Sequence, residues 1–360
     1  MTEQTRASRQ ELADVFRRFA HQQCAGRSPL YFTLSHAVAD SPELLDLAAG
    51  TRPGQPAPNM LLGAVHHILR RGAPHPLSPY FSRLEPPSQE QAAELLVDFC
   101  RRHAGQIEQI ISTRSVQTNE VNRCAVLLPA FAALQNSLDD RPMRIVDVGA
   151  SAGLNLLWNR YTYRYDDQVL RLPGSDPSTV LTCEVTGGVP PLAVDVSRFV
   201  RPVGIEVAPV DLTDREATEW LVSLTWPEQT ERQRTLRTAL ALAAQEPPTV
   251  VAGQAPEHLA QVVAETPADQ HLCFVFSWSI YQIFGSPGGR ERLAITLAEL
   301  SRRRPIHEIS IGHFGHDVPR MIMARYENGE SRSAVVAHCD VYGFWIHWLS
   351  DARPEEDGTS

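Results

Sequence analysis

The chain has 360 residues, which is enough for one large domain or two. Its hydrophobic content of 43% and charged content of 21% are those of an ordinary soluble globular protein. With 33 basic and 42 acidic residues, a net charge of −9, it lacks the basic surplus typical of nucleic-acid-binding proteins. No apolar run reaches the roughly 18 residues of a membrane span, and the N-terminus lacks the apolar core of a signal peptide. We therefore expect a cytoplasmic protein with a small-molecule substrate and with neither a nucleic-acid nor a membrane partner.

Cysteine and histidine spacing gives no metal signature. The six cysteines are scattered and form no C-x-x-C pair, which favours reduced, buried thiols over disulfides or a zinc site. The stretch HFGHD, residues 313–317, lacks a third ligand at a suitable spacing. We expect no metal, and we interpret this stretch as a loop that helps to close an active site.

Residues 1–140 predict an all-helical N-terminal domain. Apolar side chains recur at three- and four-residue spacings in segments such as ELADVFRRFA and MLLGAVHHIL. Pro42 near a helix start and Gly50 just after its end occupy the positions that these residues favour. The last helix is predicted to run from QTNEVNR into CAVLLPAFAAL, with a bend or an end near Pro129.

Residues 141–350 alternate short apolar runs with amphipathic segments. The runs MRIVDVG, VRPVGIEV, PPTVVAG and HLCFVFSW are buried-strand candidates, and the alternation predicts a mostly parallel sheet covered by helices on both faces. Period-two alternation predicts an inserted β excursion at about residues 161–195. Asn328-Gly329 between two strand-like runs predicts a terminal antiparallel hairpin. Residues 351–360 are expected to form a disordered tail.

The stretch RIVDVGASAGLNLLW, residues 144–158, allows two interpretations. Counted from Gly149 it is G-x-S-x-G, the elbow that presents a serine nucleophile, here Ser151, in α/β-hydrolases. Counted from Asp147 it is D-x-G-x-S-x-G, similar to glycine-rich turns that bind nucleotides. A hydrolase also needs several strands and an oxyanion glycine cluster upstream, whereas the preceding residues look helical. The hydrolase is therefore the weaker alternative.

In the nucleotide interpretation, Gly149 and Gly153 let the backbone approach a ligand. A helix starting near Gly153 would direct free N–H groups at that ligand.

The strands after the turn end in residues that suit a nucleotide cofactor. Glu206 ends the next parallel strand, where a carboxylate can accept hydrogen bonds from both ribose hydroxyls. Gln254 follows the third strand, where an amide can address adenine as donor and acceptor. Ser277 and Trp278 end the fourth strand, beside the expected position of the reactive group. Together these strand ends are stronger evidence than the turn alone.

Residues 143 to about 350 resemble a class I S-adenosylmethionine-dependent methyltransferase domain. Asp147, Gly149 and Gly153 match its first motif, and Glu206 matches its ribose-binding acid. The resemblance implies an α/β, Rossmann-like methyltransferase fold, with a mostly parallel seven-stranded sheet that ends in an antiparallel hairpin. It also implies S-adenosylmethionine as cosubstrate or substrate, with the helical domain as a lid.

The chain departs from the methyltransferase pattern at three points, one of which is Gln254 in place of the more usual acid. Ser151 stands where the middle glycine of the motif is usual, and the β excursion lengthens the chain between the turn and Glu206 beyond the roughly 20 residues usual in dinucleotide folds. The spacing G-x-G-x-x-G is missing, which disfavours NAD. The whole chain also resembles a bacterial family of unknown function, through QTNEVNR, DVGASAGLNL and WPEQTER.

The segment QTNEVNR is unusually polar for a helix that leads into a central strand. By spacing, Asn119, Glu120 and Arg123 fall on one helical face, so we expect them at the ligand. Glu120 could hold the amino group of the ligand, and Arg123 its carboxylate or Glu120 itself. A solvated helix face is the alternative.

Aromatic rings stabilise a sulfonium by about 0.5–2 kcal/mol each. Trp278 and Tyr281 follow the fourth strand, and Tyr163 lies in the alternating stretch YTYRY. Such alternating tyrosines also fit a half-buried strand. Our predicted catalytic residues are Glu120, Tyr163 and Tyr281.

The cofactor allows two reactions, and the fold does not choose between them. The first is methyl transfer to an oxygen, nitrogen or carbon of a small molecule. In the second, the α-amine or α-carbon of S-adenosylmethionine attacks its own γ-carbon, giving azetidine-2-carboxylate or 1-aminocyclopropane-1-carboxylate and methylthioadenosine. The resemblance implies the second route because some methyltransferase-like proteins of bacterial biosynthetic clusters form such amino acids. A binding module without catalysis is a further alternative.

Overall fold

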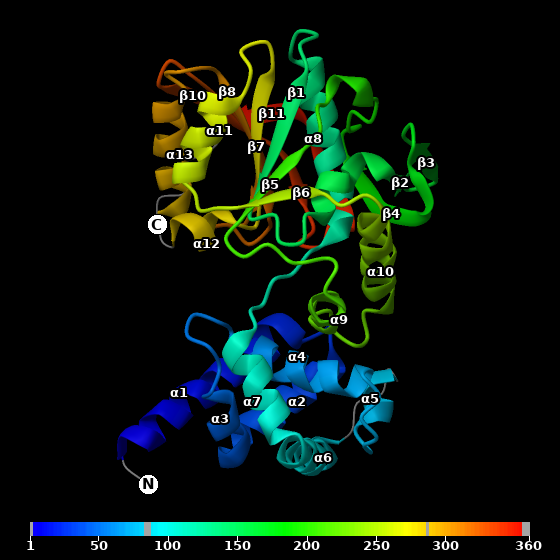
Figure 1. Ribbon diagram of the computed structural model, residues 1–360, viewed down its shortest axis with the longest axis vertical. Helices are drawn as coiled ribbons and strands as arrows, with labels where there is room; N and C mark the ends of the chain where they lie inside the picture. Colours follow the sequence, from blue (N-terminus) through cyan, green and yellow to red (C-terminus); the bar gives the residue numbers. More distant parts are fainter. Residues whose placement is uncertain (1–2, 83–87, 286–287, 355–360) are drawn as a thin grey trace. The chain divides into compact units, whose positions relative to one another are not determined.

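The computed structural model describes residues 3–82, 88–285 and 288–354 (Figure 1). The chain divides into two compact units, a helical unit formed by Met1–Thr118 with Asp214–Arg234, and a sheet unit formed by Asn119–Thr213 with Thr235–Ser360. The helical unit thus ends well before residue 140, the expected boundary, and includes a later segment that we assigned to the sheet domain.

The helical unit begins with α1, which continues directly into the π-helical turn η1 (Ala20–Cys24). Ser28 and Ser41 cap α2 and α3, each with a proline at the first helical position, where its missing N–H costs nothing. The helices assigned to this unit are α1 (Glu3–Phe19), α2 (Pro29–Asp40), α3 (Pro42–Ala48), α4 (Ala57–Arg70), α5 (Ser78–Ser82), α6 (Gln89–Arg102), α7 (Ala104–Thr113) and α9 (Arg215–Ser223). Helix α10 (Thr230–Gln245) crosses the boundary between the units.

The segment 214–234 belongs to the helical unit because its apolar side chains complete that unit's core. Trp220, Leu224 and Trp226 are buried in the same cluster as residues of α1, α2, α4, α6 and α7. Trp220 also donates its indole N–H to the carbonyl of Ser115, at 2.9 Å. Two buried tryptophans bury enough apolar surface to hold the segment in place.

The sheet unit contains an 11-stranded sheet with the order β3-β2-β4-β11-β10-β9-β8-β7-β1-β5-β6. The seven strands expected from sequence were therefore too few. The strands are β1 (Met143–Val148), β2 (Tyr161–Tyr165), β3 (Gln168–Arg171), β4 (Asp176–Gly187), β5 (Val203–Glu206), β6 (Thr249–Ala252), β7 (His271–Ser277), β8 (Ile306–Gly312), β9 (Arg320–Glu327), β10 (Glu330–Cys339) and β11 (Trp345–Pro354).

The sheet has a parallel part and a mixed part. Strands β6, β5, β1, β7 and β8 are parallel neighbours, and β9, β10 and β11 follow β8 as antiparallel neighbours. The expected hairpin joins β9 to β10, with Asn328 and Gly329 at φ values of 56° and 90°. Its two strands run consecutively outward from β8.

The β excursion extends this sheet at its far side. Strands β2, β3 and β4 join it because β4 pairs with β11 in parallel, with Trp345 opposite Glu184. Strand β11 runs to Pro354, so residues 351–354 are part of the sheet rather than of a disordered tail. Residues 355–360 lie outside the described residues.

Helices cover both faces of the parallel strands. In Figure 1, α11 (Glu257–Glu265) and α13 (Gly289–Leu300) lie on one side of β7 and β1, and α8 (Cys124–Asn136) lies on the other. Leu259, Val263, Leu293 and Leu297 from α11 and α13 pack in one cluster with buried strand residues. The short helices η2 (Val121–Arg123), η3 (Leu154–Arg160), η4 (Val196–Arg198) and α12 (Ile280–Phe284) complete the unit.

All six cysteines are buried, as their scattered spacing predicted, and no two of them are bonded together. Within residues 3–82, 88–285 and 288–354, none of the helices is long and apolar enough to cross a membrane.

A buried ion pair links α13 to the sheet. Glu308 of β8 is 1% exposed, and the guanidinium of Arg290 donates to both of its carboxylate oxygens, at 2.7 and 2.9 Å. The hydroxyls of Tyr326 and Ser310 also donate to this carboxylate. Breaking such a pair leaves a charge buried without compensation, which costs about 3–5 kcal/mol.

We therefore predict that Arg290→Met lowers the free energy of unfolding by about 3–5 kcal/mol, measured by urea denaturation. The control is Arg325→Met, which breaks the exposed pair with Glu327 and should cost less than about 1 kcal/mol. Equal losses in the two variants would contradict this account.

Candidate functional site

The turn after β1 is built from residues with positive φ. Gly149, Ser151 and Gly153 have φ values of 85°, 54° and 74°. The amides of Gly149 and Ala150 donate to the carbonyl of Ile205 in β5, at 2.8 and 3.2 Å. This close approach needs a glycine at position 204 in β5, because a Cβ there would meet the Cβ of Ala150 at 2.6 Å.

Two side chains hold the second half of the turn. The amide of Ser151 donates to Oε2 of Glu206, at 2.8 Å, and the amide of Ala152 donates to Oδ1 of Asn119, also at 2.8 Å. Glu206 ends β5, and Asn119 begins the chain segment that leads into α8. The structure thus brings together the predicted residues Asn119, Ser151 and Glu206.

The helix expected after Gly153 is not an α-helix. Residues Leu154–Arg160 form the 3₁₀-helix η3, with a kink at Leu157. Gly153 itself packs tightly, since a Cβ there would meet Cγ2 of Val250 at 2.6 Å. The turn amides of Gly149 to Ala152 donate within the protein rather than pointing freely at a ligand.

The polar segment before α8 is mostly irregular rather than helical. Residues 114–120 have no regular structure, and only Val121–Arg123 form the short helix η2, so Asn119, Glu120 and Arg123 do not share a helical face. Asn122 holds this segment by donating to the carbonyls of Thr182 and Gly343, at 2.9 and 2.8 Å. These hydrogen bonds join the segment to residues far away in sequence. The spacing of polar residues within the segment therefore could not predict its course.

Arg123 connects this segment to the end of β7. Its Nε donates to the carbonyl of Val341 at 2.9 Å, and its Nη1 lies 3.4 Å from the carbonyl oxygen of Ser277. Its guanidinium carbon lies 5.5 Å from the ring centre of Trp278, within the range of a cation–π interaction. Arg123 therefore contacts both Ser277 and Trp278. A site at the carboxyl end of β7 requires this proximity.

Asp147 lies at the centre of this region and is 5% exposed. Burial, the largest effect, raises its pKa to about 7. The positive charge of Arg123 acts in the opposite direction, and the negative charge of Glu206 raises the pKa further. A carboxyl group with this pKa changes its charge near neutral pH.

Two buried polar atoms in this region lack hydrogen-bond partners among the described residues, namely Oγ of Ser151 and Nε1 of Trp278. Trp278 has a φ of 67°, and its ring centre lies 5.1 Å from that of His313, in the loop after β8 that we expected to close the site. Each unmade hydrogen bond of this kind costs about 1–3 kcal/mol. A ligand that pairs with these atoms would recover part of that cost.

The other predicted residues have different surroundings. Glu120 is 7% exposed beside Asn119, Tyr281 of α12 is 36% exposed, and Gln254 is exposed after β6. Within the described residues, neither the Gln254 nor the Tyr281 side chain hydrogen-bonds the turn. Tyr281 lies against Phe314, with ring centres 6.3 Å apart.

Tyr163 is a core residue of β2. It is 0% exposed, and its hydroxyl donates to the carbonyl of Trp158. Its neighbours Tyr161 and Tyr165 likewise donate to the carbonyls of Leu154 and Ala125, both at 2.7 Å. The stretch YTYRY therefore has the geometry of a buried strand, and we leave Tyr163 out of the site.

Sequence reasoning did not identify Ser279 or Gly343. The hydroxyl of Ser279 donates to the carbonyl of Val148, and its Cβ occupies the space that a Cβ on Gly149 would need. Gly343 has a φ of 84° and packs against the backbone of Asn122. Neither residue stands in a motif, and both contacts form only through the tertiary fold.

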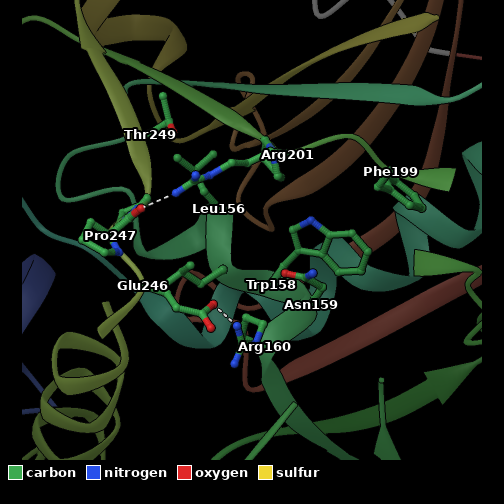
Figure 2. Close-up of a pocket in the computed structure, with 12 residues that line it drawn as sticks. Leu156, Trp158, Asn159, Arg160, Phe199, Arg201, Glu246, Pro247 and Thr249 are labelled. Carbon is green, nitrogen blue, oxygen red and sulfur yellow. Dashed lines mark hydrogen bonds and ion pairs between the residues drawn. The ribbon is translucent and has the colours of Figure 1, made fainter. Parts of the chain in front are cut away.

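A distinct cavity of about 390 Å³ lies at the opposite, amino-terminal edge of β5 and β6 (Figure 2). Figure 2 shows Arg160 paired with Glu246, and Arg201 donating to the carbonyl of Pro247 at 2.7 Å. Parallel α/β sheets bind ligands at the carboxyl ends of their strands, so this cavity is not where the fold favours a cofactor. We accordingly assign the candidate site to the cluster around Asp147 and Glu206.

Comparison with known proteins gives a family for nearly the whole chain. A family described as an uncharacterized protein conserved in bacteria (DUF2332) matches residues 13–348. The chain belongs to this family. No curated protein and no solved structure matches it significantly. Membership of the DUF2332 family assigns no reaction, so the chemistry of the site has to be argued from its geometry.

The turn geometry predicts an unequal response to two glycine substitutions. Gly149→Ala and Gly174→Ala both force an alanine into a left-handed conformation, which costs about 1–2 kcal/mol. A Cβ at position 149 would also meet the Cβ of Ser279 at 2.6 Å, whereas nothing lies within 4 Å of a Cβ at position 174. We expect Gly149→Ala to lose about 1–3 kcal/mol more than Gly174→Ala in urea unfolding. Similar losses would show that the turn is not packed as described.

The raised pKa of Asp147 predicts that the free energy of unfolding depends on pH. The pKa of an aspartate carboxyl is ordinarily 3.8, and that of Asp147 in the folded protein is about 7. At a pH between these two values, the protein therefore takes up a proton when it folds. The free energy of unfolding should therefore fall as the pH rises from about 4 to about 7. Asp147→Asn mimics the protonated carboxyl and should remove this contribution, leaving the variant more stable than the natural protein above pH 7 by a few kcal/mol, at about 1.4 kcal/mol per pKa unit.

The measurement is urea unfolding at a series of pH values between about 5 and 8. The control is Asp317→Asn, at an exposed aspartate, which should keep the natural pH dependence. A profile for Asp147→Asn that parallels that of the natural protein would contradict the raised pKa.

Proposed function

We propose that the sheet unit binds S-adenosylmethionine at the carboxyl ends of β1, β5 and β7 and transfers its methyl group to a small molecule. The observation that carries this proposal is the position of the site at a reversal of strand order. Outward from β1, the chain adds β5 and then β6 on one side, and β7 and then β8 on the other. In doubly wound sheets, ligands bind where the order reverses, and this order agrees with a Rossmann-like methyltransferase fold.

The side chains at this point suit the parts of the cofactor. Glu206 accepts from the amides of Ser151 and Ala208, and a carboxylate has about four acceptor positions, so it can also accept from ribose hydroxyls. Asp147, when ionised, offers a buried negative charge to the amino group of the ligand. The partnerless Nε1 of Trp278 and Oγ of Ser151 are buried polar atoms that a polar ligand would satisfy.

Methyl transfer requires no covalent bond between the protein and the reactants. S-adenosylmethionine, when bound, supplies an electrophilic methyl carbon on a sulfonium. The residues around it have to hold both reactants in line and exclude water, and good orientation accounts for about 7–11 kcal/mol of a barrier. The ring of Trp278, already paired with the cation of Arg123, presents a surface that also favours a sulfonium.

Cyclisation of S-adenosylmethionine is the second candidate, and Asp147 favours it. An α-ammonium group has to lose its proton before its nitrogen can attack the γ-carbon. A carboxylate with a pKa of about 7 is a suitable acceptor for that proton near neutral pH. The attacking group, not the binding residues, distinguishes this route from methyl transfer.

The geometry gives no support to a serine hydrolase. A nucleophilic serine needs a hydrogen-bonded base, commonly a histidine, and Oγ of Ser151 has no hydrogen-bond partner in the part of the chain that the structure describes. The amide of Ser151 instead binds Glu206.

The test is to incubate the full chain with S-adenosylmethionine, alone and with small-molecule extracts, and to identify the nucleoside released. We expect adenosylhomocysteine only when an acceptor is present, whereas methylthioadenosine from the cofactor alone would mean cyclisation. We also expect Glu206→Gln to weaken the binding of S-adenosylmethionine about tenfold or more in calorimetry, equivalent to about 1.4 kcal/mol.

The matched control is Glu330→Gln, at an exposed glutamate of β10, which should bind as the natural protein does. If the natural chain does not bind S-adenosylmethionine at millimolar concentration, or if Glu206→Gln binds it equally well, the proposal is wrong.

A further inference from the structure

A second cavity, of about 620 Å³, lies entirely within the helical unit. This volume is within the range of about 300–1,000 Å³ that is usual for small-molecule sites. Its walls come from α4, α7 and the first turn of α9 and include both apolar and polar side chains. The residues that matter for its chemistry are His67, Arg71, Gln106, Gln109, Arg114 and Glu216.

Two arginines converge on one carboxylate in this cavity. Arg114 donates from Nη1 to the carbonyl of Glu216 at 3.0 Å, and its Nη2 lies 3.4 Å from Oε2 of the same residue. Arg71 forms an ion pair with the other carboxylate oxygen of Glu216. The guanidinium of Arg114 is held in place over the ring of Trp220, 5.5 Å from its centre. The two positive charges are thus fixed close together by the fold.

The nearby histidine adds no charge at neutral pH. His67 is 3% exposed, and burial, with smaller effects from Arg114 and Arg71, lowers its pKa to about 4. Its Nδ1 lies 3.1 Å from Oγ of Ser223, and its Nε2 lies 3.4 Å from Oε2 of Glu216. His67 is therefore a neutral polar wall of the cavity.

The charges in the cavity wall do not balance. Arg71 and Arg114 contribute two positive charges to the wall, and Glu216 contributes one negative charge. Asp214 lies outside the wall, where it accepts from the amide of Glu216 at 2.8 Å, and its negative charge partly offsets that of Arg114. Two guanidiniums carry ten N–H donors, but one carboxylate offers only about four acceptor positions. Among the residues of the wall itself, positive charges therefore exceed negative charges by one, and hydrogen-bond donors exceed acceptors.

We propose that this cavity binds a small monoanionic molecule through its carboxylate. Arg71 and Arg114 pair with the carboxylate, since planar guanidiniums match the geometry of such groups. The amides of Gln106 and Gln109 hydrogen-bond the rest of the molecule, and Ile68 and Ile110 cover its apolar part. Glu216, whose side chain is 43% exposed, competes with the ligand for the arginines. This site belongs to the helical unit and does not depend on the function proposed for the sheet unit.

The probes are 4-fluorobenzoate, which is monoanionic, and 4-fluorobenzamide, which has a similar shape but no charge. Both are titrated with the full chain, and the fluorine NMR linewidth gives each dissociation constant. We expect the benzoate to bind at least tenfold more tightly than the benzamide. Equal binding of the two probes would overturn the proposal.

Two variants test the assigned residues. Arg71→Gln should weaken the binding of 4-fluorobenzoate at least tenfold, and Glu216→Gln should strengthen it at least threefold, because the competing carboxylate is removed. A gain in affinity cannot arise from loss of folding. If Arg71→Gln has no effect, or if Glu216→Gln weakens binding, the assignment is wrong.

The controls are Arg101→Gln and Glu43→Gln, which make the same changes of charge in an exposed pair of the helical unit outside the cavity. Both should bind 4-fluorobenzoate within twofold of the natural chain. A threefold gain in Glu43→Gln would mean that net charge alone explains the effect, and it would also overturn the proposal.

Discussion

The candidate site depends on the hydrogen bond between the amide of Ser151 and the carboxylate of Glu206. This bond joins the turn after β1 to the end of β5, two elements that are far apart in sequence. Ser151 has a positive φ here, a conformation that is uncommon for residues other than glycine. Close packing at Gly204 and at Gly149 supports this turn. The acid and the turn are thus in place before any ligand binds.

The same packing concentrates charge in a dry environment. Asp147 and Glu206 are close enough to raise the pKa of Asp147, while Arg123 opposes this effect from the segment before α8. Two acids with one arginine leave one negative charge to be balanced once Asp147 is ionised, that is, as the pH rises above about 7. A cationic ligand meets this requirement, which agrees with the proposed cofactor. The wall of the cavity in the helical unit has the opposite balance, with two arginines paired to one glutamate.

The features that could be predicted from the sequence are those that depend on a few neighbouring residues. The turn could be recognised because positive φ values demand glycine at positions 149 and 153, and Glu206 because it directly follows a short apolar run. Contacts between residues far apart in the chain could not be predicted from the sequence. The joining of β4 to β11 and the packing of Trp220 in the helical core both connect residues that are more than 100 positions apart. The segment with Asn119 and Arg123 looked helical because its spacing fits a helix. Tertiary hydrogen bonds from Asn122 and Arg123 instead hold it on a path that is helical only at Val121–Arg123.

A crystal structure of the full chain grown with S-adenosylhomocysteine tests the central claim most directly. The account predicts the nucleoside at the carboxyl ends of β1, β5 and β7, with its ribose hydroxyls within hydrogen-bond distance of Glu206. Nucleoside bound instead in the cavity beside Arg160 and Arg201, at the other edge of the sheet, would contradict it.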